Sequence, residues 1–178
     1  MADRPGILYL RTRRSGAPTL YDPGETFAIG GSVAVRSGDE DAITLAGCGV
    51  TVHEALEAAE ALERDGLRAR VLDLYSVKPI DTQALLAAAE ETGGIVVAED
   101  HWPEGGLGEA VLAALAAAGT TCPVRLLGVS DMPVSGKPEE LLAAAGIDSE
   151  AIAGAARELL DGARSGRFRR SGAPAASG

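Results

Sequence analysis

The sequence is poor in the residues that build metal centres and disulfide frameworks. It contains two cysteines, Cys48 and Cys122, and two histidines among its 178 residues. Two cysteines cannot form a disulfide framework, and a structural zinc site needs about four clustered ligands, most often Cys and His. We therefore do not expect hydrolytic chemistry at a metal held by His and Cys.

Long hydrophobic runs are lacking as well. No apolar stretch approaches the ~18 residues that a membrane-spanning helix requires. The N-terminal sequence MADRPGILYLRTRR has no basic region leading into an apolar one, so it does not have the pattern of a secretory signal. We expect a cytoplasmic chain that contacts no membrane.

Positive charge is scarce in the central part of the chain. The whole sequence carries 16 basic and 26 acidic side chains, a net charge of −10. Residues 38–161 alone hold 23 acidic and 7 basic side chains, a surplus of 16 negative charges that repels phosphate backbones. A nucleic-acid partner is therefore not expected. Residues 162–178, which contain several Arg among Gly, Ser and Ala, are predicted to be a flexible basic tail.

Short apolar strands that alternate with helices dominate the rest of the chain. Four or five consecutive apolar residues without alternation indicate strands buried on both faces, as in a parallel sheet covered by helices. Such strands are predicted at residues 43–46, 70–74, 95–98 and 124–127. Helices are predicted over about residues 52–64, 81–93, 107–118, 138–146 and 148–160. A capping box of Thr51 and Glu54 is expected to open the first helix.

These elements predict an α/β fold: one three-layer α/β/α domain over residues 39–161, with a mostly parallel sheet of about five strands. Residues 1–38 differ in texture, because β-like runs at 7–10, 27–29 and 33–35 are separated by turn signals. We assign them to an N-terminal extension or linker. In such a sheet, ligands bind at the carboxyl ends of the strands, and candidate functional residues are sought there.

Two glycines flank Cys48 between the first predicted strand of the domain and its helix. A dinucleotide-binding fingerprint needs a third Gly or Ala three residues after the second glycine, and here that position is Val52. Asp73, at the end of the next strand, could take the place of the ribose-binding acid. We favour a tight turn over a cofactor site. Cys48 precedes a helix N-terminus, which lowers a thiol pKa, but a small residue packed in the turn is the preferred interpretation.

Glu99, Asp100 and His101 have the residue types of acid–base chemistry and follow a predicted strand. No nucleophile held by a base lies near them in the sequence, so a role in the loop or at an interface is favoured and no catalytic residue is assigned. Lys137, in the motif SGKP, is a further loop or interface candidate. That motif is either a turn before a helix that starts at proline, or a set of backbone N–H groups that binds an anion.

Three arginines, Arg11, Arg13 and Arg14, follow the apolar run at residues 7–10. If that run is a strand, Arg11 and Arg13 share one face. A paired guanidinium site for a phosphate is then one interpretation, and exposed arginines are the other.

From these residues alone, the chain is an acidic α/β domain with no recognisable active site of its own. Five stretches in order resemble the C-terminal domain of transketolase: RTRRSGAPTLY, AGCGVTVHEALEAAEAL, RVLDLYSVKPID, VVAEDHWPEGGLGEAV and VSGKPEELLAAAGID. The resemblance runs from about residue 8 to residue 160. The fourth and fifth stretches favour transketolase over its thiamine-dependent relatives.

The resemblance implies a part in two-carbon ketol transfer between sugar phosphates by a homodimer that uses thiamine diphosphate and Mg²⁺. In the family, a pyrophosphate-binding and a pyrimidine-binding domain hold these groups, and the metal motif is Gly-Asp-Gly, which this sequence lacks. We therefore expect no cofactor in this chain, no activity of the chain alone, and dependence on the missing domains in the same or a separate chain. Its expected roles are scaffold and dimer contact, with regulation also open.

The resemblance also assigns one site residue. In the family, an arginine at the end of the pyrimidine-binding domain helps to bind the substrate's phosphate, and a gap-free register places it on Arg14. Residues 1–25 are then the last part of that domain and its linker. A function of a different class stays open, namely a stand-alone module that binds a small anion at the strand ends.

Overall fold

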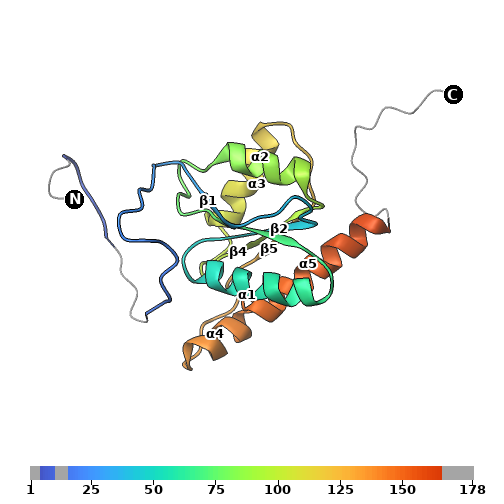
Figure 1. Cartoon of the computed structure of the whole chain (residues 1–178). Helices are drawn as coiled ribbons and strands as arrows, with labels where there is room; N and C mark the ends of the chain where they lie inside the picture. The colour runs from blue at the N-terminus through green and yellow to red at the C-terminus, as the bar shows by residue number, and fades with distance from the viewer. Residues whose placement is uncertain (1–4, 11–15, 166–178) are drawn as a thin grey trace.

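A five-stranded sheet forms the centre of the molecule in the computed structural model, which describes residues 5–10 and 16–165 (Figure 1). The strand order is β1-β3-β2-β4-β5. β1 pairs antiparallel with β3, and all other pairs are parallel. The strands are β1 (Val33–Arg36), β2 (Ile43–Gly47), β3 (Ala69–Asp73), β4 (Ile95–Ala98) and β5 (Val124–Leu127). The predicted α/β fold with a mostly parallel sheet is confirmed.

Helices cover both faces of this sheet. The helices are α1 (Val50–Arg64), α2 (Thr82–Glu91), α3 (Leu107–Ala117), α4 (Pro138–Ala145) and α5 (Ser149–Arg164). Figure 1 shows α2 and α3 on one face and α1 and α5 on the other, with the short α4 leading into α5. The sheet is therefore the middle of three layers. The helices α1, α2 and α3 each return the chain to the start of the next parallel strand, and α4 and α5 follow the last strand.

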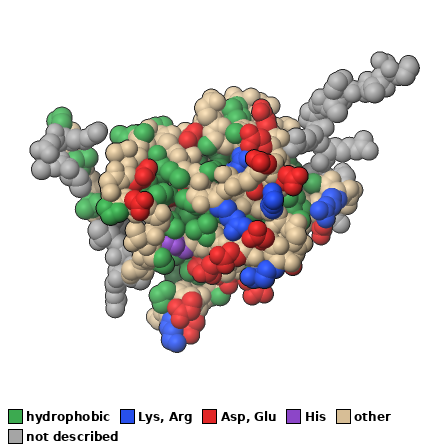
Figure 2. Space-filling model, in the orientation of Figure 1, with side chains coloured by type: hydrophobic (Ala, Val, Ile, Leu, Met, Phe, Trp, Pro, Cys, Tyr) green, Lys and Arg blue, Asp and Glu red, His purple; other side chains and the backbone are tan. Residues whose placement is uncertain are grey.

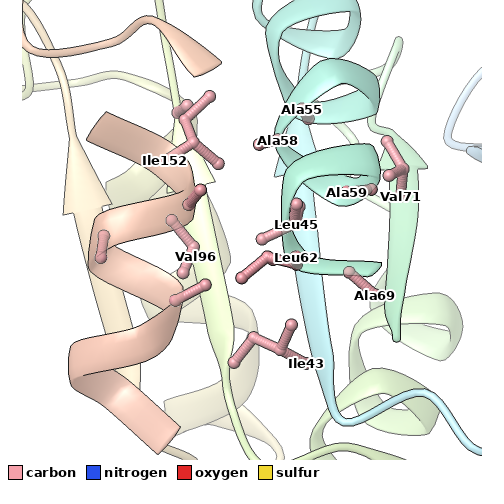
Figure 3. Close-up of a cluster of buried hydrophobic side chains, with 14 of the residues drawn as sticks. Ile43, Leu45, Ala55, Ala58, Ala59, Leu62, Ala69, Val71, Val96 and Ile152 are labelled. Atoms are coloured by element: carbon pink, nitrogen blue, oxygen red, sulfur yellow. The ribbon is translucent and has the colours of Figure 1, made fainter. Parts of the chain in front are cut away.

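The apolar runs of the strands form two cores, one on each face. On the face of α1 and α5, Leu45 and Val96 of the sheet lie against Leu62 and Ile152 of the helices (Figure 3). On the other face, Val97 packs with residues of α2 and α3. Neighbouring residues of one strand point to opposite faces, so both sets of side chains are buried. Each buried Leu or Ile contributes roughly 1.5–3 kcal/mol of stability.

The β-like runs at residues 7–10 and 27–29 do not form strands. Both runs have β-like composition, but neither pairs with another strand, and Ile7 and Ile29 are 102% and 73% exposed. A strand needs a partner for its backbone hydrogen bonds and a face to bury. The run at 33–35 has both, because it lies beside β3 as part of β1. The sheet thus begins before residue 39, where the sequence placed the start of the domain.

The predicted capping box of α1 is also wrong. The helix begins at Val50 with Gly49 as its N-cap, and Thr51 lies inside the first turn. Glu54 accepts a hydrogen bond from the backbone N–H of Ser149, at a distance of 2.9 Å, at the start of α5. The side chains of Thr51 and Glu54 have partners on neighbouring elements, so tertiary contacts override the local capping pattern.

Candidate functional site

The carboxyl ends of β2, β3 and β4 meet at one edge of the sheet, where sheets of this type bind ligands. Gly47, the last residue of β2, is in register with Asp73 on one side and Ala98 on the other. The chain leaves β2 through α1 on one face and enters α3 from β4 on the other face. The candidate residues near Cys48, Asp73 and Glu99 therefore lie in adjacent loops.

The ends of β2 and β4 are joined by Thr51. Its hydroxyl donates to the carbonyl oxygen of Ala98 at 2.7 Å and accepts from the backbone N–H of Cys48 at 3.1 Å. A Cβ atom on Gly47 would lie 2.7 Å from the Thr51 hydroxyl oxygen, so only glycine fits there. Gly49 has a φ of 66°, which favours glycine. Both glycines thus serve the turn itself, in support of the tight-turn interpretation.

Cys48 is half-buried in this turn. Burial raises the pKa of its thiol, and the negative charge of Asp73 raises it further. A raised pKa keeps the thiol protonated, whereas nucleophilic and metal-binding cysteines need the thiolate. The structure therefore gives no support for a reactive Cys48.

Asp73 is a buried carboxylate with one oxygen engaged. The residue is 6% exposed, and Oδ2 accepts a hydrogen bond of 2.6 Å from the hydroxyl of Tyr21. Its Oδ1 is buried and has no hydrogen-bond partner in the described part of the chain. Burial raises the pKa of Asp73, against the opposing effects of the Tyr21 hydrogen bond and nearby His53. Burial and Asp73 in turn raise the pKa of Tyr21.

Residues 21–32, which we call the strap, cross this edge of the sheet before β1. Phe27 makes edge-to-face ring contacts with Tyr21 and Tyr75, with centroids 4.8 and 5.0 Å apart. The backbone N–H of Gly30 donates to the Ser76 hydroxyl at 2.9 Å. The Ser32 hydroxyl donates to Asp81 Oδ2, also at 2.9 Å. Sequence reasoning missed these contacts; the signal available was the aromatic content of the strap in a chain with only 3% aromatic residues.

Glu99 holds the N-terminus of α3. Its two carboxylate oxygens accept the backbone N–H groups of Leu107 and Gly108 at 2.7 and 3.0 Å. A Cβ atom on Gly106 would overlap the Glu99 carboxylate, and one on Gly108 would lie 3.1 Å from it and 2.9 Å from Leu126. Gly106 and Gly108 of the EGGLG segment therefore make room for this carboxylate. Glu99 is buried and engaged in capping, so it is not placed as a general acid or base.

Asp100 and His101 follow Glu99 directly in the sequence but, unlike Glu99, are exposed to solvent. Both residues are exposed, and Trp102 beside them is 48% exposed. The Nδ1 atom of His101 lies 2.5 Å from the Trp102 carbonyl oxygen and 3.8 Å from Glu99 Oε2. The three residue types named for acid–base chemistry are thus divided between a helix cap and an exposed loop. Their role at a loop or interface stays a prediction.

Lys137 is exposed at the start of α4, and its backbone N–H donates to Glu140 Oε2 at 3.0 Å. Pro138 is the first residue of that helix. The starts of α2, α3, α4 and α5 each receive a carboxylate of this chain, from Asp81, Glu99, Glu140 and Asp148 respectively. These carboxylates would repel an incoming anion. The starts of these four helices are therefore not suited to binding an anion, whereas α1 begins without a side-chain cap, so the anion-binding module stays a prediction.

Arg14, with Arg11 and Arg13, lies outside the described residues. Among residues 5–10 and 16–165, no group of three or more His, Cys, Asp or Glu side chains could hold a metal ion. We therefore assign no residue to Mg²⁺ or to thiamine diphosphate. In the same ranges, no helix is both long and apolar enough to cross a membrane.

Known proteins resemble this chain over most of its length. The family model described as "Transketolase, C-terminal domain" matches residues 31–152. Transketolase-like protein 1 of Bos taurus is 44% identical over 160 residues, which are 89% of this chain and 27% of that protein. Transketolase of Homo sapiens is 44% identical over 161 residues, 89% of this chain and 26% of that protein. The chain thus spans about a quarter of the length of these relatives.

Among solved structures, one described as "Split gene transketolase, inactive beta4 tetramer" superposes with a TM-score of 0.77. Its sequence is 36% identical, over 83% of this chain and 48% of that chain. Transketolase from Leishmania mexicana has a TM-score of 0.58 at 23% identity, over 82% of this chain and 19% of that chain, and so shows the fold alone.

Proposed function

Since the chain belongs to the transketolase family, in which it corresponds to the C-terminal domain, we propose that it is a non-catalytic part of a cytoplasmic enzyme that transfers ketol groups between sugar phosphates. The observation that carries this proposal is the family match over residues 31–152. The engagement of both Glu99 carboxylate oxygens by backbone N–H groups of α3 supports a role other than catalysis.

The chemistry then belongs to polypeptide outside this chain. In the complete enzyme, thiamine diphosphate with Mg²⁺ supplies the nucleophilic carbon for ketol transfer. The residues described here offer no ligand set for either group, so the pyrophosphate- and pyrimidine-binding domains must hold them. A split-gene transketolase with a TM-score of 0.77 supports an assembly in which such domains lie on the same or a separate chain.

Within that assembly the chain serves as scaffold and contact surface, in a homodimer. Large hydrophobic side chains are exposed around the carboxyl edge of the sheet, at Ile29, Trp102, Met132 and Val134. On the face in Figure 2, hydrophobic side chains gather towards the N-terminal segment, whereas charged side chains of both signs cover the region of α1 and α5. Exposed apolar groups of this kind mark contact sites. Asp100, His101 and Lys137 lie in the exposed loops of this edge, and Glu99 shapes one of them.

Arg14 is the residue proposed to bind the substrate's phosphate. A guanidinium forms two parallel, charge-assisted hydrogen bonds with a phosphate, and such a contact is worth roughly 1.5–3 kcal/mol. We expect Arg14 to recognise the phosphate and to leave the reacting carbons to the other domains.

The test combines this chain with the two missing domains of its transketolase and measures ketol transfer. We expect no turnover from the chain alone and turnover from the combination. Arg14→Ala should lower kcat/KM for phosphorylated acceptors at least tenfold and leave unphosphorylated acceptors unaffected. Arg64→Ala, at the exposed end of α1, is the control and should leave both acceptor types unaffected. An equal loss with both acceptor types would refute phosphate binding by Arg14. Ketol transfer by the isolated chain in the presence of thiamine diphosphate would refute the non-catalytic role.

A further inference from the structure

The N-terminal part of the chain first contacts the body of the domain at Leu20 and Tyr21. Residues 5–10 and 16–19 are exposed, and Leu20 is the first side chain that packs against the core on the α1 and α5 side. Tyr21 follows, with its hydroxyl on Asp73. Between Tyr21 and β1 the strap is mostly exposed: Phe27 is 46% and Ile29 73% exposed. The strap is therefore held by little buried apolar surface, by the ring contacts of Phe27 and by a few polar contacts.

The Tyr21–Asp73 contact is the strongest of these by its chemistry. The other two hydrogen bonds between a side chain and the strap are those of Gly30 with Ser76 and of Ser32 with Asp81, and only the second involves a carboxylate. Asp81 has a second partner, the Ala84 N–H, whereas Asp73 has none in the described residues besides Tyr21. Without the phenol, a buried carboxylate would have both oxygens unpaired. The Tyr21 hydrogen bond therefore offsets part of the cost of burying this carboxylate under the strap.

We propose that Tyr21 and Asp73 form the anchor that fixes the strap to the carboxyl edge of β3. Tyr21 is then a positioning residue for the polypeptide that precedes it, which includes Arg14 seven positions earlier in the sequence. The anchor is inferred from the contacts within this chain alone. The positioning of Arg14 for the substrate's phosphate rests, in addition, on the proposed function.

Hydrogen exchange of the full chain tests the anchor directly. In the strap, the N–H of Gly30 donates to Ser76 and that of Gly31 donates to the Ala28 carbonyl oxygen at 3.1 Å. Tyr21→Phe keeps the ring and removes the hydroxyl. We expect exchange of these two amides to become about tenfold faster or more, with exchange in β2 and β4 unchanged.

Tyr75→Phe is the matched control, since it removes a phenol hydroxyl from the same aromatic cluster but no hydrogen bond of the anchor. The Tyr75 hydroxyl lies against Gly31, so this control is evaluated at the Gly30 amide, whose exchange rate should equal that in the wild type. Asp73→Ala should loosen the strap like Tyr21→Phe, and the double variant should be no looser than either single one. Strap exchange that is unchanged in Tyr21→Phe, equally fast in Tyr75→Phe, or additive in the double variant would overturn the anchor.

The positioning role is tested in the enzyme assembled with the missing domains. Tyr21→Phe should raise KM for a phosphorylated acceptor about threefold or more and change kcat by less than about twofold, whereas Tyr75→Phe changes neither. An unchanged KM in an assembly whose strap exchanges faster would overturn the positioning role. If the wild-type assembly has no activity, the proposed function fails, and the exchange experiment still decides on the anchor.

Discussion

Two buried carboxylates lie at the carboxyl edge of the sheet, on either side of β2, and are used in different ways. Asp73 at the end of β3 and Glu99 directly after β4 are 6% and 5% exposed. Glu99 has both oxygens paired with backbone N–H groups of α3, eight and nine residues along the chain. Asp73 has one oxygen paired with Tyr21, 52 residues away, and the other without a hydrogen-bond partner in the described residues. Equal burial therefore does not mean an equal contribution to stability.

The difference arises from the group that each carboxylate binds. Glu99 meets the partial positive charge of a helix N-terminus, whose first N–H groups need acceptors. Asp73 meets a phenol that can donate a single hydrogen bond, and its burial raises its pKa. We infer that Glu99 stabilises the fold outright, whereas the charge of Asp73 opposes folding and serves to hold the strap.

The largest expected effect comes from closing the space that Glu99 occupies. Gly106→Ala places a methyl group on its carboxylate, so either the backbone shifts or two N–H groups of α3 lose their acceptors. The free energy of unfolding should fall by about 2–4 kcal/mol, as measured by urea denaturation. Gly154→Ala, in α5 with open space around its Cβ position, should be neutral or raise stability by up to ~1 kcal/mol. Equal stability of the two variants would contradict the prediction.

Removing the charge of Glu99 has the next largest effect. In Glu99→Gln one of the two acceptors becomes an amide NH₂ group that faces an N–H donor. The free energy of unfolding should fall by about 1–3 kcal/mol. Glu109 offers the control, because its side chain accepts the Gly105 N–H at 2.8 Å on the exposed side of the same turn. Glu109→Gln should lower stability by less than ~1 kcal/mol, and a larger loss there than at Glu99 would overturn the assigned cap.

The same change at Asp73 is expected to act in the opposite direction. Burial raises the folded-state pKa of Asp73 above its ordinary value of 3.8, so the folded protein binds the proton more tightly than the unfolded chain. The ionised group therefore lowers stability above the folded pKa, and this loss is relieved as the pH falls through it. Asp73→Asn should raise the free energy of unfolding at pH 7 by about 1 kcal/mol.

The gain in Asp73→Asn should shrink as the pH falls from above the folded pKa towards 3.8, as followed by urea denaturation over that range. Glu99→Gln, measured in parallel, provides the comparison with a carboxylate that has two partners. A loss of stability in Asp73→Asn at pH 7 would show that the Tyr21 hydrogen bond outweighs the burial of the charge.

The sequence predicts well the elements whose partners are implied by their own pattern. Strands such as β4 are buried on both faces, and four consecutive apolar residues indicate this burial directly. The sequence predicts poorly those contacts that depend on residues far away along the chain. The run at residues 27–29 has strand-like composition without a neighbouring strand, and Thr51 and Glu54 fit a capping box but bind Ala98 and Ser149 instead.

In the candidate site, too, the local contact could be predicted from the sequence and the long-range contact could not. The cap of α3 by Glu99 is local, and its signal was present: two glycines, Gly106 and Gly108, stand where a carboxylate would need space. The Tyr21–Asp73 contact links residues 52 positions apart, and no spacing rule connects a tyrosine in an irregular segment to a strand end. Asp73 was considered for a ribose, whereas its engaged oxygen holds the chain's own phenol.

The smallest expected effect concerns the thiol beside Asp73. Burial raises the pKa of Cys48, and the charge of Asp73 adds to the increase. In a Cys122→Ser background, where Cys48 is the remaining cysteine, modification by a thiol reagent at pH 8 should be slower than that of an unfolded control peptide. Adding Asp73→Asn removes the nearby charge but not the burial, so the rate should rise by about twofold and stay below that of the peptide.

Glu99→Gln in the same background should leave the rate unchanged, because its carboxylate is bound to α3 and is no cause of the raised pKa of Cys48. A rise that is equal in the two variants would mean that general loosening of the edge, and not the charge of Asp73, controls access to the thiol.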